Sequence, residues 1–102
     1  MSNRIELHEK LCEILGSRNV YFQPPESIKL VYPAIVYTTY IIRKVAANDR
    51  GYIMTPAYET VLIDKNPDSE YVEKLIELPY SSFNRSYAVD NLNHFVFTIY
   101  NQ

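Results

Sequence analysis

The chain has little of the residue types on which several kinds of site depend. Cysteine occurs once, at Cys12, so no intrachain disulfide can form. Glycine occurs only at Gly16 and Gly51, which is too few for a glycine-rich phosphate-binding loop. The spacings typical of CxxC, HExxH and calcium-binding loops are also missing. These shortages argue against a nucleotide or metal cofactor, and the lone cysteine favours folding in a cytoplasm.

A strongly basic character and a long apolar run are also missing. The formal net charge is −2 and the isoelectric point is about 5.6. No long basic stretch is available for a phosphate backbone, so no nucleic-acid partner is expected. No apolar run approaches the roughly 18 residues of a membrane span, and the N-terminal residues predict an amphipathic helix rather than a signal peptide. No membrane partner is expected either.

Tyrosine is the residue type that the chain has in abundance. It has ten tyrosines, four phenylalanines and no tryptophan. Tyrosine suits a half-buried sheet surface and is enriched where proteins meet proteins. The length of 102 residues predicts a single domain, residues 1–102, with one modest core. A small sheet-containing domain with a protein-binding surface is therefore favoured.

The hydrophobic pattern predicts the element order α-β-β-β-α-β-β. Apolar residues at helical spacing alternate with β-branched and aromatic runs that are separated by proline, glycine and asparagine. The predicted elements are a helix at 3–15 closed by Gly16, a strand at 19–23, a connection at 26–32, a strand at 34–45, a strand at 52–64 with an edge or bulge at Pro56, a helix opening at Pro67 and ending before Pro79, and two final strands meeting near Asp90-Asn91.

The last third of the chain indicates how these elements pack. Tyr71, Leu75 and Leu78 recur on one face of the second helix, which would then cover a sheet. Phe95 and Phe97 share one face of the last strand and are expected to be buried against this layer. The sequence thus predicts an α+β fold: a two-layer sandwich in which an antiparallel or mixed sheet carries both helices on one face.

The strand predicted at 34–45 has more apolar surface than a small domain can cover. It is a β-branched and aromatic run of a kind usually covered on both faces, and the helices can cover only one. We therefore predict that tyrosines of this strand lie on an intersubunit face. The charged hairpin beyond it is either a docking element or a solvated turn. The candidate interaction residues are Tyr37, Tyr40, Arg43, Asn48, Asp49 and Arg50.

No combination of residues makes a convincing catalytic or metal site. Ser81, Ser82, Asp90 and His94 could form a hydrolase constellation, but no nearby glycine offers an oxyanion hole. A metal site built from His94 with Asp64 or Asp90 would lack a third protein ligand. We therefore predict no catalytic, metal-binding or cofactor-binding residues, and expect that the protein is not an enzyme.

Several segments resemble small proteins of tailed bacteriophages and prophages that are encoded among the head–tail connection and tail genes. The resemblance covers most of the chain beyond Pro33, and the first helix is compatible with it. The segments that carry it are Pro33-Ala34-Ile35-Val36-Tyr37, the strand from Tyr58 to Asp64, Pro67-Asp68-Ser69, Leu78-Pro79, Ser82-Phe83-Asn84-Arg85-Ser86-Tyr87, and Asp90-Asn91-Leu92-Asn93-His94 with the following Phe95-Val96-Phe97-Thr98-Ile99-Tyr100.

The resemblance implies a tail terminator, also called a tail-completion or head–tail joining protein. Such proteins have an α+β fold, assemble as hexameric rings, end growth of the tail tube and join it to the head. The implied partners are copies of the same chain, the tail tube protein and a head-completion or connector protein. The implied location is the host bacterial cytoplasm during assembly and then the virion. No catalytic residues belong to the family.

Two other interpretations of the sequence stay open. Related folds serve other positions in the head–tail connector, so an adaptor or head-closure component is one alternative. A small α+β ligand-binding or regulatory module, dimeric through its sheet, is the alternative from a different functional class. Such a module needs a concave pocket with converging polar groups.

Overall fold

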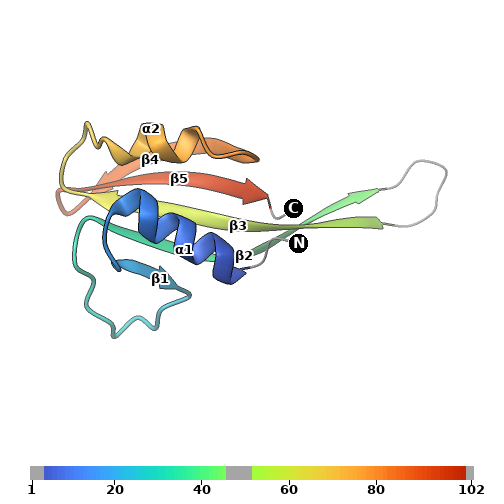
Figure 1. The fold of residues 1–102 in the computed structure, drawn as a ribbon, viewed down its shortest axis with the longest axis horizontal. Coiled ribbons are helices and arrows are strands. Elements are labelled where there is room, and N and C mark those ends of the chain that lie inside the picture. The colour runs from blue at the N-terminus through green and yellow to red at the C-terminus, as the bar shows by residue number, and fades with distance from the viewer. Residues whose placement is uncertain (1–3, 46–51, 101–102) are drawn as a thin grey trace.

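The computed structural model describes residues 4–45 and 52–100. The predicted order α-β-β-β-α-β-β is confirmed (Figure 1). The five strands form one mixed sheet in the order β1-β2-β3-β5-β4, in which β1 runs parallel to β2 and the other neighbours are antiparallel. The elements are α1 (Arg4–Leu15), β1 (Val20–Phe22), β2 (Ala34–Val45), β3 (Tyr52–Asp64), α2 (Tyr71–Ile76), β4 (Ser81–Val89) and β5 (Leu92–Tyr100).

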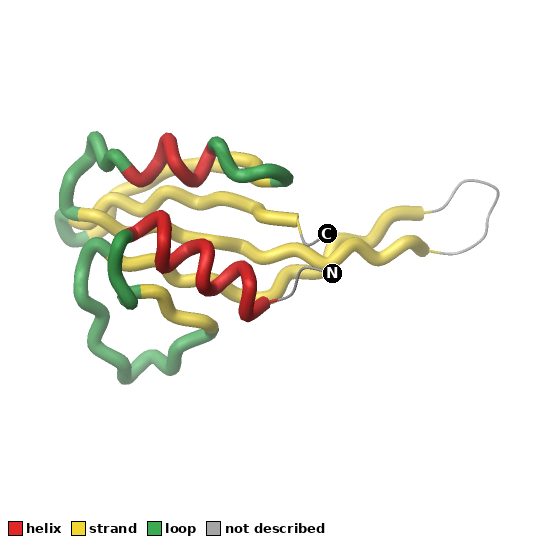
Figure 2. Tube along the Cα trace, viewed as in Figure 1, coloured by secondary structure: helices red, strands yellow, loops and turns green. Residues whose placement is uncertain are grey.

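Both helices lie on one face of the sheet, as predicted (Figure 2). The core fills the space between the two layers. Phe97 is fully buried and Phe95 packs at the edge of the core, which confirms the predicted orientation of the last strand. The buried members of the core are Leu11, Cys12, Leu15, Val20, Ile35, Tyr37, Tyr58, Leu62, Leu75, Phe97 and Ile99.

The first helix is built as its apolar stripe predicts. Leu11 and Leu15 are buried against the sheet, with Cys12 beside them as a small buried hydrophobe. The helix ends at Gly16, whose φ of 74° is costly for any residue with a side chain. The Gly16 N–H donates to the carbonyl of Cys12 at 2.8 Å and closes the last turn.

The second helix is shorter than predicted. It begins at Tyr71 rather than Pro67, because side chains ahead of it form turns instead. Asn66 Oδ1 accepts the N–H of Asp68 at 3.0 Å, a local bond that competes with helix formation. The buried Ser69 precedes the N-cap residue Glu70, and its Oγ accepts the N–H of Tyr71 at 3.4 Å. Leu75 still reaches the core as predicted.

The last two strands form the predicted tight hairpin. Asp90 and Asn91 both have positive φ, 53° and 63°, as a two-residue type I′ turn requires. The pairing shifts between Phe83 and Arg85. This irregularity places Phe83 over Phe97 on the helix side, with ring centroids 5.3 Å apart, and brings Tyr87 opposite His94.

Strands β2 and β3 continue past the end of the rest of the sheet. β3 pairs with β5 only as far as Ala57, and β1 pairs with β2 only near Tyr37. Beyond these points the two strands pair only with each other, from Ile41–Pro56 to Val45–Tyr52. We call residues 41–45 and 52–56 the arm. It projects past both helices (Figures 1 and 2), and Pro56 stands where β3 becomes an edge, as predicted.

Candidate functional site

The face of the sheet that carries no helix has an apolar centre. Residues of β3 alternate between the two faces, so Tyr58 and Leu62 enter the core while Val61 and Ile63 lie on the helix-free face. The pairing aligns Val61 with Val36 on one side and Val96 on the other. Val96 is fully buried although it belongs to this face. The centre of the helix-free face is therefore apolar and partly buried within the single chain.

The connection between β1 and β2 builds one wall on this face. At Gln23 the chain has a φ of 43° and then meets Pro24 and Pro25, which redirect it out of the sheet. The Gln23 side chain extends the ladder, because its Oε1 accepts the N–H of Thr39 at 3.2 Å. Leu30 of this connection is half-buried over the sheet, whereas Val31 is exposed.

A stacked aromatic pair builds the opposite wall. The rings of Tyr87 on β4 and His94 on β5 lie 4.8 Å apart and are nearly parallel, with an interplanar angle of 11°. His94 Nδ1 donates to the carbonyl of Leu92 at 3.1 Å, which fixes the plane of the imidazole. Arg85 lies over the Tyr87 ring of this pair, with its guanidinium carbon 5.8 Å from the centre of that ring. The wall is therefore held by side chains of two strands.

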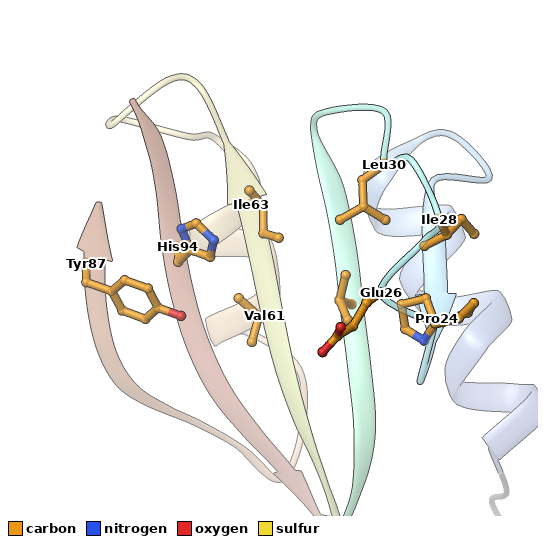
Figure 3. Close-up of a pocket in the computed structure, with 10 residues that line it drawn as sticks. Pro24, Glu26, Ile28, Leu30, Val61, Ile63, Tyr87 and His94 are labelled. Carbon is orange, nitrogen blue, oxygen red and sulfur yellow. The ribbon is translucent and has the colours of Figure 1, made fainter. Parts of the chain in front are cut away.

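The two walls enclose an open groove of about 330 Å³ (Figure 3). Its floor is formed by strands β2 and β3, so the groove is about two strand spacings, or roughly 10 Å, wide. Most of its lining is apolar, and an extended apolar segment suits its shape. The lining residues are Pro24, Pro25, Glu26, Ile28 and Leu30 from the connection, Val36, Val61 and Ile63 from the floor, and Tyr87 and His94 from the aromatic wall.

Two carboxylates on this face have no cationic partner among the side chains of residues 4–39 and 57–100. Glu26 belongs to the connection wall, and its carboxylate points over the floor in Figure 3. Glu59 lies two residues along β3 from Val61 and therefore on the same face, toward the arm. The ion pairs of this part of the chain join Lys10 to Glu13 and Arg18 to Glu9, all on or next to α1.

The prediction that Tyr37 lies on an intersubunit face is wrong. Tyr37 is fully buried in the core, because the alternation of β2 turns it toward the helices. Its hydroxyl is hydrogen-bonded to His8 Nδ1 at 2.7 Å, and its ring meets those of Phe22 and Tyr58 with centroids 5.0 and 5.9 Å away. Burial raises the pKa of Tyr37, although nearby Arg4 opposes the shift. Tyr37 is a structural residue.

The other predicted interaction residues stay predictions. The backbone of Tyr40 pairs with Ala57 at the base of the arm, and that of Arg43 pairs with Met54 within it. Their side chains lie outside what the structure describes. Residues 46–51, which include the candidates Asn48, Asp49 and Arg50, also lie outside the described residues.

The register of the last hairpin separates the residues of the hydrolase constellation. Ser82 pairs with Thr98, four residues along β5 from His94, which is about 13 Å at the rise of a strand. Ser81 is one pair farther away, and its buried Oγ has no hydrogen-bond partner. Neither hydroxyl can therefore contact His94. Among the residues that the structure describes, no group of three or more His, Cys, Asp or Glu side chains could hold a metal ion.

Sequence reasoning missed the groove. Glu26, Leu30, Val61, Tyr87 and His94 come from four separate parts of the chain, and no local pattern brings them together. One signal was present: the connection carries Ile28 and Leu30 at positions where a purely solvated loop would be polar.

Comparisons of the chain with protein-family models, with curated proteins and with solved structures found no match. None of the described helices has the length and apolar character needed to cross a membrane.

Proposed function

We propose that this chain is a structural subunit of a tailed-bacteriophage or prophage tail: a terminator that forms a ring at the head-proximal end of the tail tube. Two kinds of observation support the proposal. The sequence resembles proteins of this kind over most of its length, and the α+β fold that the resemblance implies is the fold of the chain.

The arm is the observation that carries the proposal. It is a two-stranded ribbon with no third strand and no helix of the described chain beside it (Figure 1). Six of its ten residues are Ile, Val, Met or Tyr. A lone two-stranded ribbon is marginally stable in water, and one of this composition would expose apolar surface. An arm of this kind is suited to binding another protein chain.

A ring subunit works by shape and repetition rather than by chemistry. One patch of each copy fits a different patch of its neighbour, and the ring closes when the rotation between copies returns to the start. One ring face then docks on the last ring of the tube and the other on the head connector. Each contact can be weak, because a ring repeats it several times at once. Asn48, Asp49 and Arg50 at the tip of the hairpin are the candidates for such a repeated contact.

A complementation experiment tests this function. A phage that lacks its own terminator gene is supplied with this chain from a plasmid, and tails are examined by electron microscopy. We expect tails of uniform length joined to heads, whereas the empty plasmid should give free heads and overlong or unjoined tails. Tails of uniform length that fail to join heads would instead favour a separate connector component and contradict the joining role.

The groove favours a second candidate function, that of a small ligand-binding or regulatory module. Its volume of about 330 Å³ lies in the range of small-molecule sites, and Glu26, Tyr87 and His94 supply polar groups to an apolar floor. Against this, the groove is closer to an open surface than to an enclosed cavity. A dimeric protein that co-purifies with a metabolite, detected by mass spectrometry under non-denaturing and then denaturing conditions, would support this alternative.

A further inference from the structure

We propose that the groove on the helix-free face receives the arm of a second copy of this chain. This contact would be the subunit contact of the ring, so the inference rests on the proposed ring assembly and names the surfaces that build it. It also assigns a partner to each of the two surfaces that the single chain leaves incomplete.

The occupant has to come from another copy, because arm and groove are built on the same two strands. Val36 and Val61 form the floor on β2 and β3, and the arm is the continuation of these strands toward the hairpin tip. A strand cannot fold back on its own floor without breaking the ladder between Ile41 and Val45. An arm that enters a groove therefore joins two copies through different patches, which is the heterologous arrangement that closes into rings.

The arm has the shape and composition that the groove accepts. Two β layers pack face to face about 10 Å apart with their strands within roughly 30° of each other. A two-stranded ribbon laid along β2 and β3 of a neighbour matches this arrangement and fits between the connection wall and the aromatic wall. The apolar residues of the arm would then cover Val61, which the single chain leaves half-buried at the floor of the groove beside the buried Ile63.

Charge favours the arm over other segments of the chain. The described part of the arm holds two cations, Arg43 and Lys44, and no acidic residue. The groove side holds Glu26 and Glu59, neither of which has an ion-pair partner among the described residues. Of the cations near the groove, Lys29 is exposed on the connection and Arg85 lies at the opposite wall over Tyr87. A basic ribbon that enters beside the connection wall would meet the carboxylates and avoid Arg85.

The test reverses each set of charges in a separate variant. The groove variant carries Glu26→Lys and Glu59→Lys, and the arm variant carries Arg43→Glu and Lys44→Glu. Each variant alone would set like charges against each other at every contact. We expect the concentration needed for assembly to rise by roughly ten-fold or more, with monomers seen by native mass spectrometry where the unchanged chain assembles.

Mixing the two variants supplies the decisive result. The arm of each variant then meets a groove of opposite charge on the other, so an equal mixture should assemble with the two variants alternating. Tags of different mass show the composition of each oligomer. A control with Glu73→Lys and Glu77→Lys changes the charge by the same amount on the exposed surface near α2, and should assemble like the unchanged chain. Far-UV circular dichroism checks that every variant is folded.

A covalent version tests the same contact without relying on charge. A chain with Ile28→Cys is mixed with a chain that carries Arg43→Cys and oxidised gently. The proposed contact sets the arm beside the connection wall, so a disulfide between the two variants is expected. A disulfide forms only where the two Cα atoms come within about 7 Å of each other. The matched control places the first cysteine at Ile76, which is exposed on the helix layer, and should not crosslink.

The outcomes separate this inference from the proposed ring. If the unchanged chain forms a ring that neither charge reversal weakens, the arm-in-groove contact is overturned and the ring stands. Variants that fail to assemble alone and also fail as a mixture, with no crosslink through Ile28→Cys, would overturn the contact as well. An unchanged chain that stays monomeric at every concentration would overturn both the ring and the contact.

Discussion

The two halves of the β2–β3 hairpin are similar in composition but differ in the strands that lie beside them. In the half nearest the helices, Ile35 and Leu62 are fully buried between α1, α2 and the sheet. In the arm, equally apolar residues such as Ile42 and Ile53 lie on strands that pair only with each other. The first half is covered by the helices of the same chain, and we call it the completed half. In the second half, the described chain supplies no third strand beside the arm.

This difference shows that composition alone does not decide whether a stretch of strand enters the core of its own chain. The run from Ala34 to Val45 is rich in β-branched and aromatic residues, yet Ile35 and Tyr37 near its start enter the core while its last five residues build the arm. Among the described residues, the boundary falls after the last pair between β3 and β5, which joins Ala57 to Tyr100. Pro56 follows this boundary, because a proline is tolerated where a strand has lost its neighbour on one side.

The largest expected effect tests the completed half. Replacing Phe97 by alanine should lower the free energy of unfolding by about 3–5 kcal/mol, because it leaves a cavity under both helices. Urea denaturation followed by circular dichroism measures the change. Phe83→Ala is the matched control: Phe83 contacts the same ring but is 44% exposed, so its loss should be smaller. Equal losses would mean that the core does not lie where we place it.

A smaller effect is expected from Tyr37→Phe, which removes a hydroxyl from the completed half. Losing the hydrogen bond to His8 should cost about 1 kcal/mol near neutral pH.

The same variant should change how stability depends on pH. Burial raises the pKa of Tyr37 in the folded state, so the unfolded chain releases the proton first. The stability that this tyrosine contributes is thus complete below pH ~10 and is lost as the pH rises beyond it. The Phe variant lacks this loss, so its deficit relative to the unchanged chain should shrink at high pH. A deficit that is constant from pH 8 to pH 11 would show that Tyr37 is not buried.

The smallest effect on the monomer is expected in the arm. Ile42→Ser should change the free energy of unfolding by less than about 0.5 kcal/mol when measured at dilutions where the chain is monomeric. Ile35→Ser is the matched substitution in the completed half and should cost several times more, because Ile35 is fully buried. Similar costs for the two would mean that the monomer itself covers the arm, and the comparison would fail.

Local signals in the sequence predicted much of the fold. The bounds of β2 and the turn at Asp90-Asn91 follow from neighbouring residues, and the structure confirms both. The start of α2 was wrong because Asn66 and Ser69 offer competing side-chain bonds to the backbone, and their outcome depends on how the turn packs. A short polar residue ahead of a helix can cap the first turn, or it can form a separate turn that moves the start of the helix to a later residue. The sequence pattern is the same in both cases.

The candidate site was predicted less well, for a geometric reason. In a strand that is apolar on both faces, alternation does not reveal which face meets the helices, so Tyr37 was assigned to the wrong side. The groove depends on the connection after β1 crossing the sheet toward Tyr87 and His94, which lie more than 50 residues later. Only the surplus of apolar residues in β2 pointed to a surface that the two helices cannot cover.

The mass of the protein in solution tests the central claim most directly, measured for the unchanged chain and for a variant in which Asn-Gly replaces residues 41–56 between Tyr40 and Ala57. This shortened hairpin removes no residue of the core that the structure describes. We predict six times the 12.0 kDa of one chain for the unchanged protein, and a folded monomer for the shortened one. An unchanged chain that is monomeric, or a shortened chain that still forms the same ring, would contradict the account.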